Sequence, residues 1–186
     1  MKTTVHYFGL MLLLFLSAGF TINNRDLARE HKTARLGAEH TLLLADEDFV
    51  KKAAEGGLME MKAAELAVKT STNAGVKSFA QAMIKDHGKA NTELQATAKK
   101  KGIETPTALS PQNEQKLKDL SSKQGAAFDA AYAQAMVNDH QMTVELFRTE
   151  AKDGKDADLK SWAAGKLPVL EHHLTMAQEL ANKTKQ

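Results

Sequence analysis

Four stretches of helical periodicity, separated by short polar turns, restrict this chain to a small set of folds. Apolar residues recur every three or four positions in each stretch, and only three prolines occur among the 186 residues. Aromatic residues make up 5% of the chain, and no stretch shows the alternation that is typical of strands. The sequence therefore predicts an all-α protein with one main domain, because this length suits a single core.

Turn and capping signals indicate where the helices begin and end. The turn Ser71-Thr72-Asn73 contains a capping residue for the helix that follows it. Ser110 and Asp156 are suited to cap helix starts, and Pro111 suits the first position of a helix. Short links join the long helices into two pairs, and a longer crossover that contains a short helix joins the pairs. Bundles with one long crossover include the ferritin-like folds, so we predict a ferritin-like four-helix bundle over residues 46–183. The expected helices are 46–70, 74–101, 111–121, 125–152 and 157–182.

The first 19 residues have the layout of a secretory signal peptide. A charged Lys2 precedes an apolar run at 8–16, and the small residues 17–19 follow it. The run is too short to span a bilayer comfortably, which favours a cleaved signal over the alternative of a membrane anchor. We expect an exported protein, in the periplasm or associated with the outer membrane, without an integral membrane domain after cleavage.

Residues 20–45 are polar, carry mixed charge and lack sustained periodicity. They are predicted to form a flexible tether, in which His31 and His40 are solvated. The chain contains no cysteine, which excludes lipid attachment to a cysteine and is compatible with an oxidising compartment.

The balance of charges argues against a nucleic-acid partner. Twenty-five basic and 23 acidic residues leave a formal net charge of +2. The one compact basic run, at 99–101, precedes a glycine, as cations at the end of a helix do. A nucleic-acid surface would need more basic residues on one face, interleaved with aromatic ones. No nucleic-acid partner is expected, and a homo-oligomer is left open.

Two nine-residue segments of the chain are closely similar. Residues 79–87 and 132–140 align without a gap, and six of the nine positions are identical. Each segment ends in Asp-His and carries a methionine four residues before the histidine. Either one helix was duplicated, or both segments fill the same kind of position in the core.

Helical spacing places one polar residue near the middle of the apolar stripe of each long helix, and Lys166 also interrupts the stripe of the last helix. Each lies close to the middle of its helix, so all four would meet at one level whichever way the helices run. A buried carboxylate alone is costly, and histidines or a cation nearby remove that cost. The four residues are Glu60, His87, His140 and His173.

These four residues are the primary candidates for a metal site. Carboxylate and imidazole suit zinc, iron or manganese, whereas thioether and imidazole suit copper, and the predicted ion is copper, iron or zinc. The alternative is structural: each histidine only hydrogen-bonds a neighbouring carboxylate or carbonyl, since buried ionisable groups mark functional sites only statistically. The secondary candidates are Met83, Met136, Asp86, Asp139 and His172.

The motif for di-iron chemistry is missing from the sequence. Di-iron bundles use a Glu from two helices and Glu-x-x-His from the other two, and no Glu-x-x-His occurs in this chain. No nucleophile–base arrangement and no glycine-rich phosphate loop stands out. No catalytic residue is predicted. The sequence therefore favours a protein that is not an enzyme, but it does not exclude an enzyme.

Two positions inside the expected helices are unusual. Each glycine of the pair Gly56-Gly57 costs about 1 kcal/mol relative to alanine, so we expect another helix to approach closely there. Pro168 must kink the last helix or open one of its backbone hydrogen bonds. Both features are more often matters of packing than of catalysis.

Short motifs occur in order along residues 46–182. They are Asp48-Phe49-Val50, Ala54-Glu55-Gly56-Gly57, Phe79-Ala80 with Met83, Asp86-His87, Phe128 with Tyr132, Asp139-His140, Leu167-Pro168, and His173-Leu174 with Ala177. In this order they resemble the bacterial family catalogued as domain of unknown function 4142. The resemblance implies an exported ferritin-like bundle and leaves the activity open. His172 has no counterpart in the pattern, so His173 is favoured over it.

Two functions remain in competition. The first is an exported bundle that binds a transition metal in its core, for storage, buffering or protection under stress. The second is a non-catalytic envelope or stress protein without a metal, whose surface contacts a partner or another copy. Replacement of the core histidines would leave the second function intact.

Overall fold

The computed structural model describes residues 24–185, and this part of the chain is all-helical. The predicted signal peptide and residues 20–23 lie outside the described residues, as do the side chains of His31 and His40. No helix in the described part is long and apolar enough to cross a membrane. The five helices are α1 (Asn24–Thr70), α2 (Ala74–Lys100), α3 (Pro111–Ser121), α4 (Gly125–Asp153) and α5 (Ala157–Thr184).

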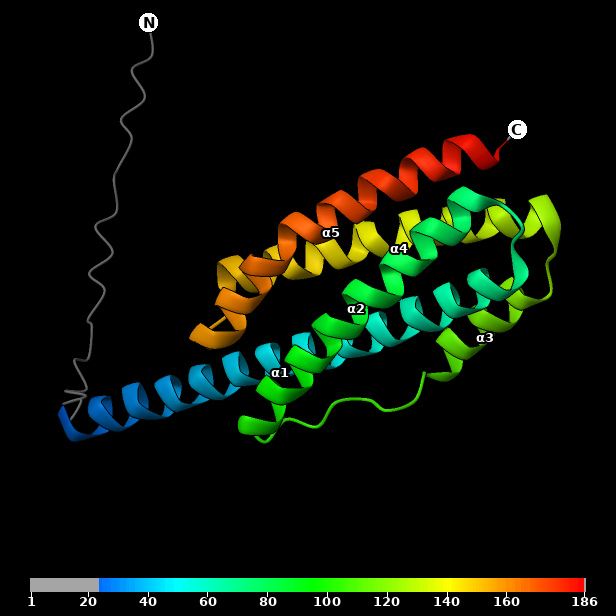
Figure 1. Cartoon of the computed structure of the whole chain (residues 1–186). Coiled ribbons are helices and arrows are strands. Elements are labelled where there is room, and N and C mark those ends of the chain that lie inside the picture. Colours follow the sequence, from blue (N-terminus) through cyan, green and yellow to red (C-terminus); the bar gives the residue numbers. More distant parts are fainter. Residues whose placement is uncertain (1–23, 186) are drawn as a thin grey trace, which may run out of the picture. The chain divides into compact units, whose positions relative to one another are not determined.

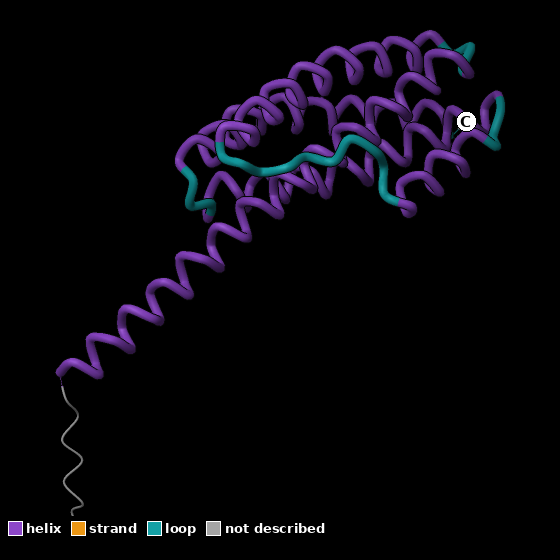
Figure 2. Tube along the Cα trace, turned by 90° about the horizontal axis from the view of Figure 1, so that it is seen from below, coloured by secondary structure: helices purple, strands orange, loops and turns teal. Residues whose placement is uncertain are grey.

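The long helices follow the predicted connectivity within the unit Ala38–Gln186. Short turns join α1 to α2 and α4 to α5, so each pair is antiparallel (Figure 1). The segment 101–110 and the short helix α3 run along the bundle between the two pairs, so that α4 begins near the end where α2 begins (Figures 1 and 2). The predicted ferritin-like four-helix bundle with one longer crossover is confirmed.

The first helix begins at Asn24 rather than at Asp46. Residues 24–45 contain no proline and are rich in alanine, leucine and arginine, which favour helix. Extending an existing helix needs no new nucleus, and an amphipathic pattern is not required for it. The predicted start of the first helix is therefore wrong, while the role of this segment as a tether stays a prediction.

The capping residues expected from the sequence mark the observed helix starts. Asn73 accepts hydrogen bonds from the backbone N–H groups of residues 75 and 76 at the start of α2. Ser110 caps α3, whose first residue is Pro111, and Asp156 caps α5. These side chains satisfy backbone donors that a helix leaves unpaired, so the turns end where the sequence indicates.

The buried apolar residues form two clusters, which lie on either side of a polar layer. One cluster contains Phe49, Leu94, Val144, Phe147 and Leu159. The other contains Met83, Phe79, Phe128, Tyr132 and Met136. On α2, α4 and α5 a buried histidine lies between the residues of the two clusters, and on α1 Glu60 follows Met59, the first residue of the second cluster. The core is therefore interrupted at one level, by a layer that all four long helices share.

The two unusual helix positions have separate explanations. A Cβ on Gly57 would lie 2.3 Å from Asn91 Oδ1, whereas a Cβ on Gly56 would meet nothing within 4 Å. The expected close approach of helices is thus made by Gly57. Pro168 lies inside α5 on an exposed face, where water can reach the carbonyl of Ala164 that the proline cannot bond.

Candidate metal centre

The four polar residues of the layer come from four different helices and are all buried. Glu60 lies on α1, His87 on α2, His140 on α4 and His173 on α5. The exposed fraction of each is 6% or less. The structure therefore brings together the complete set of primary candidates that the helical spacing selects.

The three imidazoles surround a common point. Their ring centroids are 5.4, 5.4 and 5.6 Å apart. One nitrogen from each of His87, His140 and His173 lies within 4.8 Å of the others. Nitrogens that share an ion at about 2.0–2.1 Å are roughly 3.4 Å apart in tetrahedral geometry, so small ring rotations would close the site around an ion.

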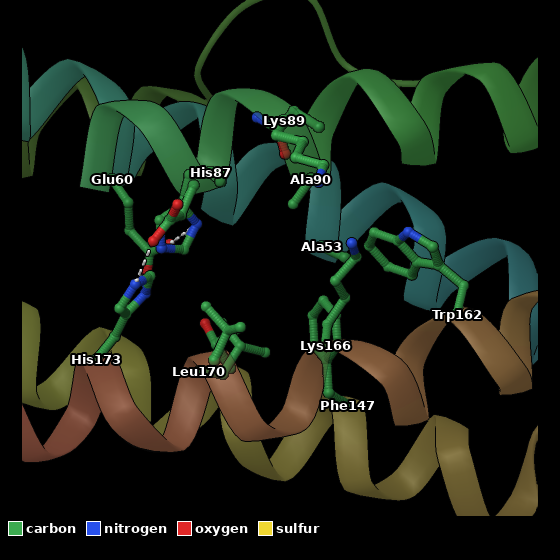
Figure 3. Close-up of a pocket in the computed structure, with 15 residues that line it drawn as sticks. Ala53, Glu60, His87, Lys89, Ala90, Phe147, Trp162, Lys166, Leu170 and His173 are labelled. Carbon is green, nitrogen blue, oxygen red and sulfur yellow. Dashed lines mark hydrogen bonds and ion pairs between the residues drawn. The ribbon is translucent and has the colours of Figure 1, made fainter. Parts of the chain in front are cut away.

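In each ring, one nitrogen already lies against an acceptor. The pairs are His87 Nδ1 with Glu60 Oε2 at 2.9 Å, His140 Nδ1 with the Met136 carbonyl oxygen at 2.9 Å, and His173 Nε2 with Asp86 Oδ2 at 3.0 Å. Figure 3 shows Glu60, His87 and His173 gathered at one side of the pocket. An N–H facing an acceptor fixes the tautomer and the plane of the ring, as outer-shell partners do in metal sites.

The remaining nitrogen of each ring is buried without a hydrogen-bond partner among the described residues. These atoms are His87 Nε2, His140 Nε2 and His173 Nδ1. Buried polar atoms of this kind are uncommon and call for an explanation, one of which is an absent ion. Three of them in one cluster match the donor set of a three-histidine metal site.

Glu60 supplies negative charge to the centre of this layer. Burial raises the pKa of its carboxyl, but the neighbouring histidines lower it more, to about 2. Its Oε1 lies 3.6 Å from His140 Nδ1, and neither carboxylate oxygen receives a well-directed hydrogen bond from a described residue. Glu60 is therefore an ionised group that needs positive charge nearby.

The histidines respond differently to this carboxylate. Burial lowers the pKa of His87, but the charge of Glu60 raises it more, so the net shift is upward. Burial lowers the pKa of His140, and burial together with the charge of His87 lowers that of His173 to about 4. Two of the three rings are thus neutral near pH 7, which is the form that binds metals.

The secondary candidates have different surroundings. Met83 and Met136 are fully buried in the apolar cluster one turn from the histidines. Asp139 lies 3.9 Å from Lys116, and burial together with the charge of Glu60 raises its pKa to about 6. His172 is exposed, next to the buried His173. The structure thus separates His172 from the cluster.

The sequence suggested Asp86 only as a secondary ligand, whereas in the structure it is an acceptor for His173. The repeated Asp-His pair was a signal for this residue, but the two copies differ in their contacts. Asp86 reaches across from α2 to α5, whereas Asp139 faces Lys116 of α3. The repeat therefore could not predict which of the two aspartates orients a histidine.

A pocket that the sequence did not indicate opens beside the histidine cluster. It has a volume of about 180 Å³. Glu60, His87 and His173 form one end, and Trp162 with Lys166 forms the other (Figure 3). The only earlier sign was Lys166 on the apolar stripe of the last helix.

The pocket end away from the histidines is held by polar contacts. The Lys166 ammonium pairs with Glu93 and lies 5.8 Å from the centre of the Trp162 ring. The indole N–H of Trp162 donates to the same carboxylate, at 3.2 Å. The lysine on the apolar stripe is thus accounted for by a neighbouring helix.

The fold and the site together place this chain in the class of helical bundles that carry a polar centre inside the core. Here that centre is a buried layer of three histidines and a glutamate. This chain belongs to the family described as "Domain of unknown function (DUF4142)", whose model matches residues 31–180. The family expected from the sequence motifs is confirmed. No curated protein matches the chain.

A solved structure has a similar fold. It is described as "CopM in the Cu(I)-bound form", and the comparison has a TM-score of 0.63 at 15% sequence identity. The similarity covers 74% of this chain and 96% of the other. At this level of identity, the similarity supports the helical fold.

Proposed function

We propose that this protein binds one transition-metal ion in the core of its bundle, through His87, His140 and His173. The observation that carries the proposal is a cluster of three buried histidines, with one nitrogen of each within 4.8 Å of the others. In each ring one nitrogen has no partner among the described residues, and the other lies against an acceptor. Three protein nitrogens are the ligand set of several zinc centres, and imidazole also suits copper, iron and nickel.

Glu60 has a supporting role in this proposal. Its carboxylate faces the Nδ1 atoms of two histidines rather than their unpartnered nitrogens. It therefore orients His87 and balances the charge of the ion, as an outer-shell carboxylate does. Asp86 has the corresponding role for His173.

Copper is the first ion to test. The similar structure was described with Cu(I) bound, and imidazole donors next to buried methionines form a soft environment. Zinc and iron are the alternatives. The signal-like residues 1–19 support export, so we propose that the protein stores, buffers or sequesters the ion outside the cytoplasm.

The experiment is elemental analysis of the protein purified without chelator and then loaded in parallel with Cu(I), Cu(II) and Zn²⁺. We expect one tightly held ion per chain for the wild type and for the exposed control His172→Ala. The variants His87→Ala and His140→Ala should lose it, because two nitrogens do not hold an ion as three do.

Circular dichroism shows whether each variant keeps its helices, so that loss of the ion is not confused with loss of the fold. Equal metal content in all four proteins, or none in the folded wild type, would reject the proposal. In that case the histidines are structural, and the competing hypothesis of an interaction protein remains.

A further inference from the structure

We infer that a divalent ion in the histidine cluster keeps one coordination position open toward the pocket, and that this position takes a small anionic donor ligand. The inference rests on the proposed function. It adds the chemical class of an external ligand, which is a small anion such as a carboxylate or azide. It also adds the place where that ligand binds.

The first support is the position of the pocket. Among the three histidines, His87 and His173 line it and His140 does not. An ion between the three rings would therefore have protein on the side of His140 and open space on the opposite side. A metal with three protein ligands and a free fourth position is the arrangement that exchanges external ligands.

The second support is that the two carboxylates on the pocket side, Glu60 and Asp86, each already lie against a histidine. Glu60 Oε2 lies 2.9 Å from His87 Nδ1, whereas the unpartnered nitrogen of that ring is Nε2. Asp86 is engaged with His173 Nε2 in the same way. Both carboxylates thus hold rings in place, and the nitrogens that they contact are not the unpartnered ones.

The third support is the charge and size of the space. A divalent ion held by three neutral imidazoles keeps its charge of +2, and Lys89 and Lys166 of the lining add two positive charges. The carboxylates of Glu60, Asp86 and Glu93 balance three of these four. In a poorly solvated interior the remainder attracts an anion. The pocket has room for several water molecules.

The walls indicate that the ligand is small. Phe147, Trp162 and Leu170 give the pocket an apolar side (Figure 3). Ala90 lies in its wall on α2, one turn beyond His87. An alanine at this position leaves space that a larger side chain would fill.

The test uses the full chain loaded with Co²⁺, whose visible spectrum reports the number and type of its ligands. Sodium azide and sodium acetate are titrated into the loaded protein. We expect a saturable change in the spectrum with each anion, and no change with sodium perchlorate, which is a poor donor.

A pair of variants then locates the anion. Ala90→Leu fills the pocket without altering a histidine, and it should raise the azide dissociation constant about tenfold or more. Ala82→Leu is the matched control, because Ala82 is a partly buried alanine of the same helix outside the pocket. It should bind azide as the wild type does.

Each outcome decides between the two proposals. A wild type that binds no Co²⁺ overturns the open position together with the metal site. A wild type that holds Co²⁺ but shows no response to either anion overturns the open position alone. Unchanged azide affinity in metal-loaded Ala90→Leu also overturns it. If Ala90→Leu does not fold, Ala53→Val fills the same pocket from α1 and is judged in the same way.

Discussion

At the scale of single residues, the position of protons determines whether the cluster can bind a metal. Each ring turns one nitrogen toward an acceptor: a carboxylate for His87, a backbone carbonyl for His140 and a carboxylate for His173. The other nitrogen of each ring then carries the lone pair and has no partner among the described residues. Glu60 is the acceptor that also carries the balancing charge.

The variant Glu60→Gln separates charge from shape at this centre. The amide keeps the size of the side chain and places an oxygen near His87 Nδ1, but the negative charge is lost. Because outer-shell partners contribute about 10- to 100-fold to metal affinity, we expect the affinity to fall by that factor with one ion still bound at saturation. Competition with a chromophoric chelator measures this change.

The exposed His172→Gln serves as the control and should leave the affinity unchanged. Complete loss of binding in Glu60→Gln, with the fold intact, would show that the carboxylate is itself a ligand. Unchanged affinity would show that its charge has no part in the site.

At the scale of helices, the glycine pair in α1 shows that neighbouring residues of one type can have different roles. The Gly57 position is filled on one side by the Asn91 side chain of α2, whereas Gly56 faces open space. Glycine inside a helix costs about 1 kcal/mol relative to alanine. Only Gly57 offsets that cost by permitting a close contact.

We therefore expect opposite effects from two alanine substitutions. Gly56→Ala should raise the free energy of unfolding by about 0.5–1 kcal/mol, because it adds helix propensity without a clash. Gly57→Ala should lower it, because the new methyl group displaces Asn91. Urea denaturation of both variants measures the difference, and equal gains would show that Asn91 moves without cost.

The last turn of α4 contains a buried carboxylate, Glu150, whose pKa is raised in the folded state. Burial, and then the charges of Asp46 and Asp156, raise the pKa of Glu150 from 4.5 to about 7. Asp46 accepts hydrogen bonds from the backbone N–H groups of residues 155 and 156, so its negative charge is held in place. Glu150 Oε1 is buried without a partner among the described residues.

This pKa shift makes stability depend on pH. Between pH 4.5 and 7 the folded state keeps a proton that the unfolded state releases, so the free energy of unfolding falls as the pH rises through this range. Glu150→Gln removes the effect. At pH 8 the variant should be about 1–2 kcal/mol more stable than the wild type, after allowance for solvent screening.

At pH 4.5 the two proteins should unfold alike. Denaturation curves at several pH values measure the difference. Parallel pH profiles of the variant and the wild type would show that Glu150 is not protonated in the folded bundle.

At the scale of the whole molecule, the polar layer lies between two apolar clusters and is shared by four helices. An ion held by three of these helices would join α2, α4 and α5 in the middle of the core. A ligand that binds only the folded state stabilises it in proportion to the logarithm of its concentration. Metal binding and folding should therefore be coupled.

We expect the ion to raise the melting temperature of the wild type. At a free concentration about 100 times the dissociation constant, the gain is about 2.7 kcal/mol, or roughly 5–10 °C for a chain of this length. Calorimetry with metal and with chelator measures it. The melting temperature of His140→Ala should be the same in both conditions, and an equal shift in that variant would point to binding elsewhere.

Much of the fold was determined locally by the sequence. Asn73, Ser110 and Asp156 cap the helices that they were predicted to cap, because capping depends on a few adjacent residues. The spacing of apolar residues also placed one polar side chain on the inner face of each long helix. The start of α1 was missed because its first residues favour helix without an amphipathic pattern.

Tertiary structure alone decided how the polar residues are used. The two Asp-His pairs are alike in sequence, yet Asp86 orients a histidine of another helix and Asp139 lies near Lys116. The role of Glu60 toward His87 and the pocket beside His173 likewise depend on side chains from different helices. Periodicity specifies which face of a helix a residue occupies. The partner that it meets is set by the rotation and height at which the helices pack, and these depend on the whole core.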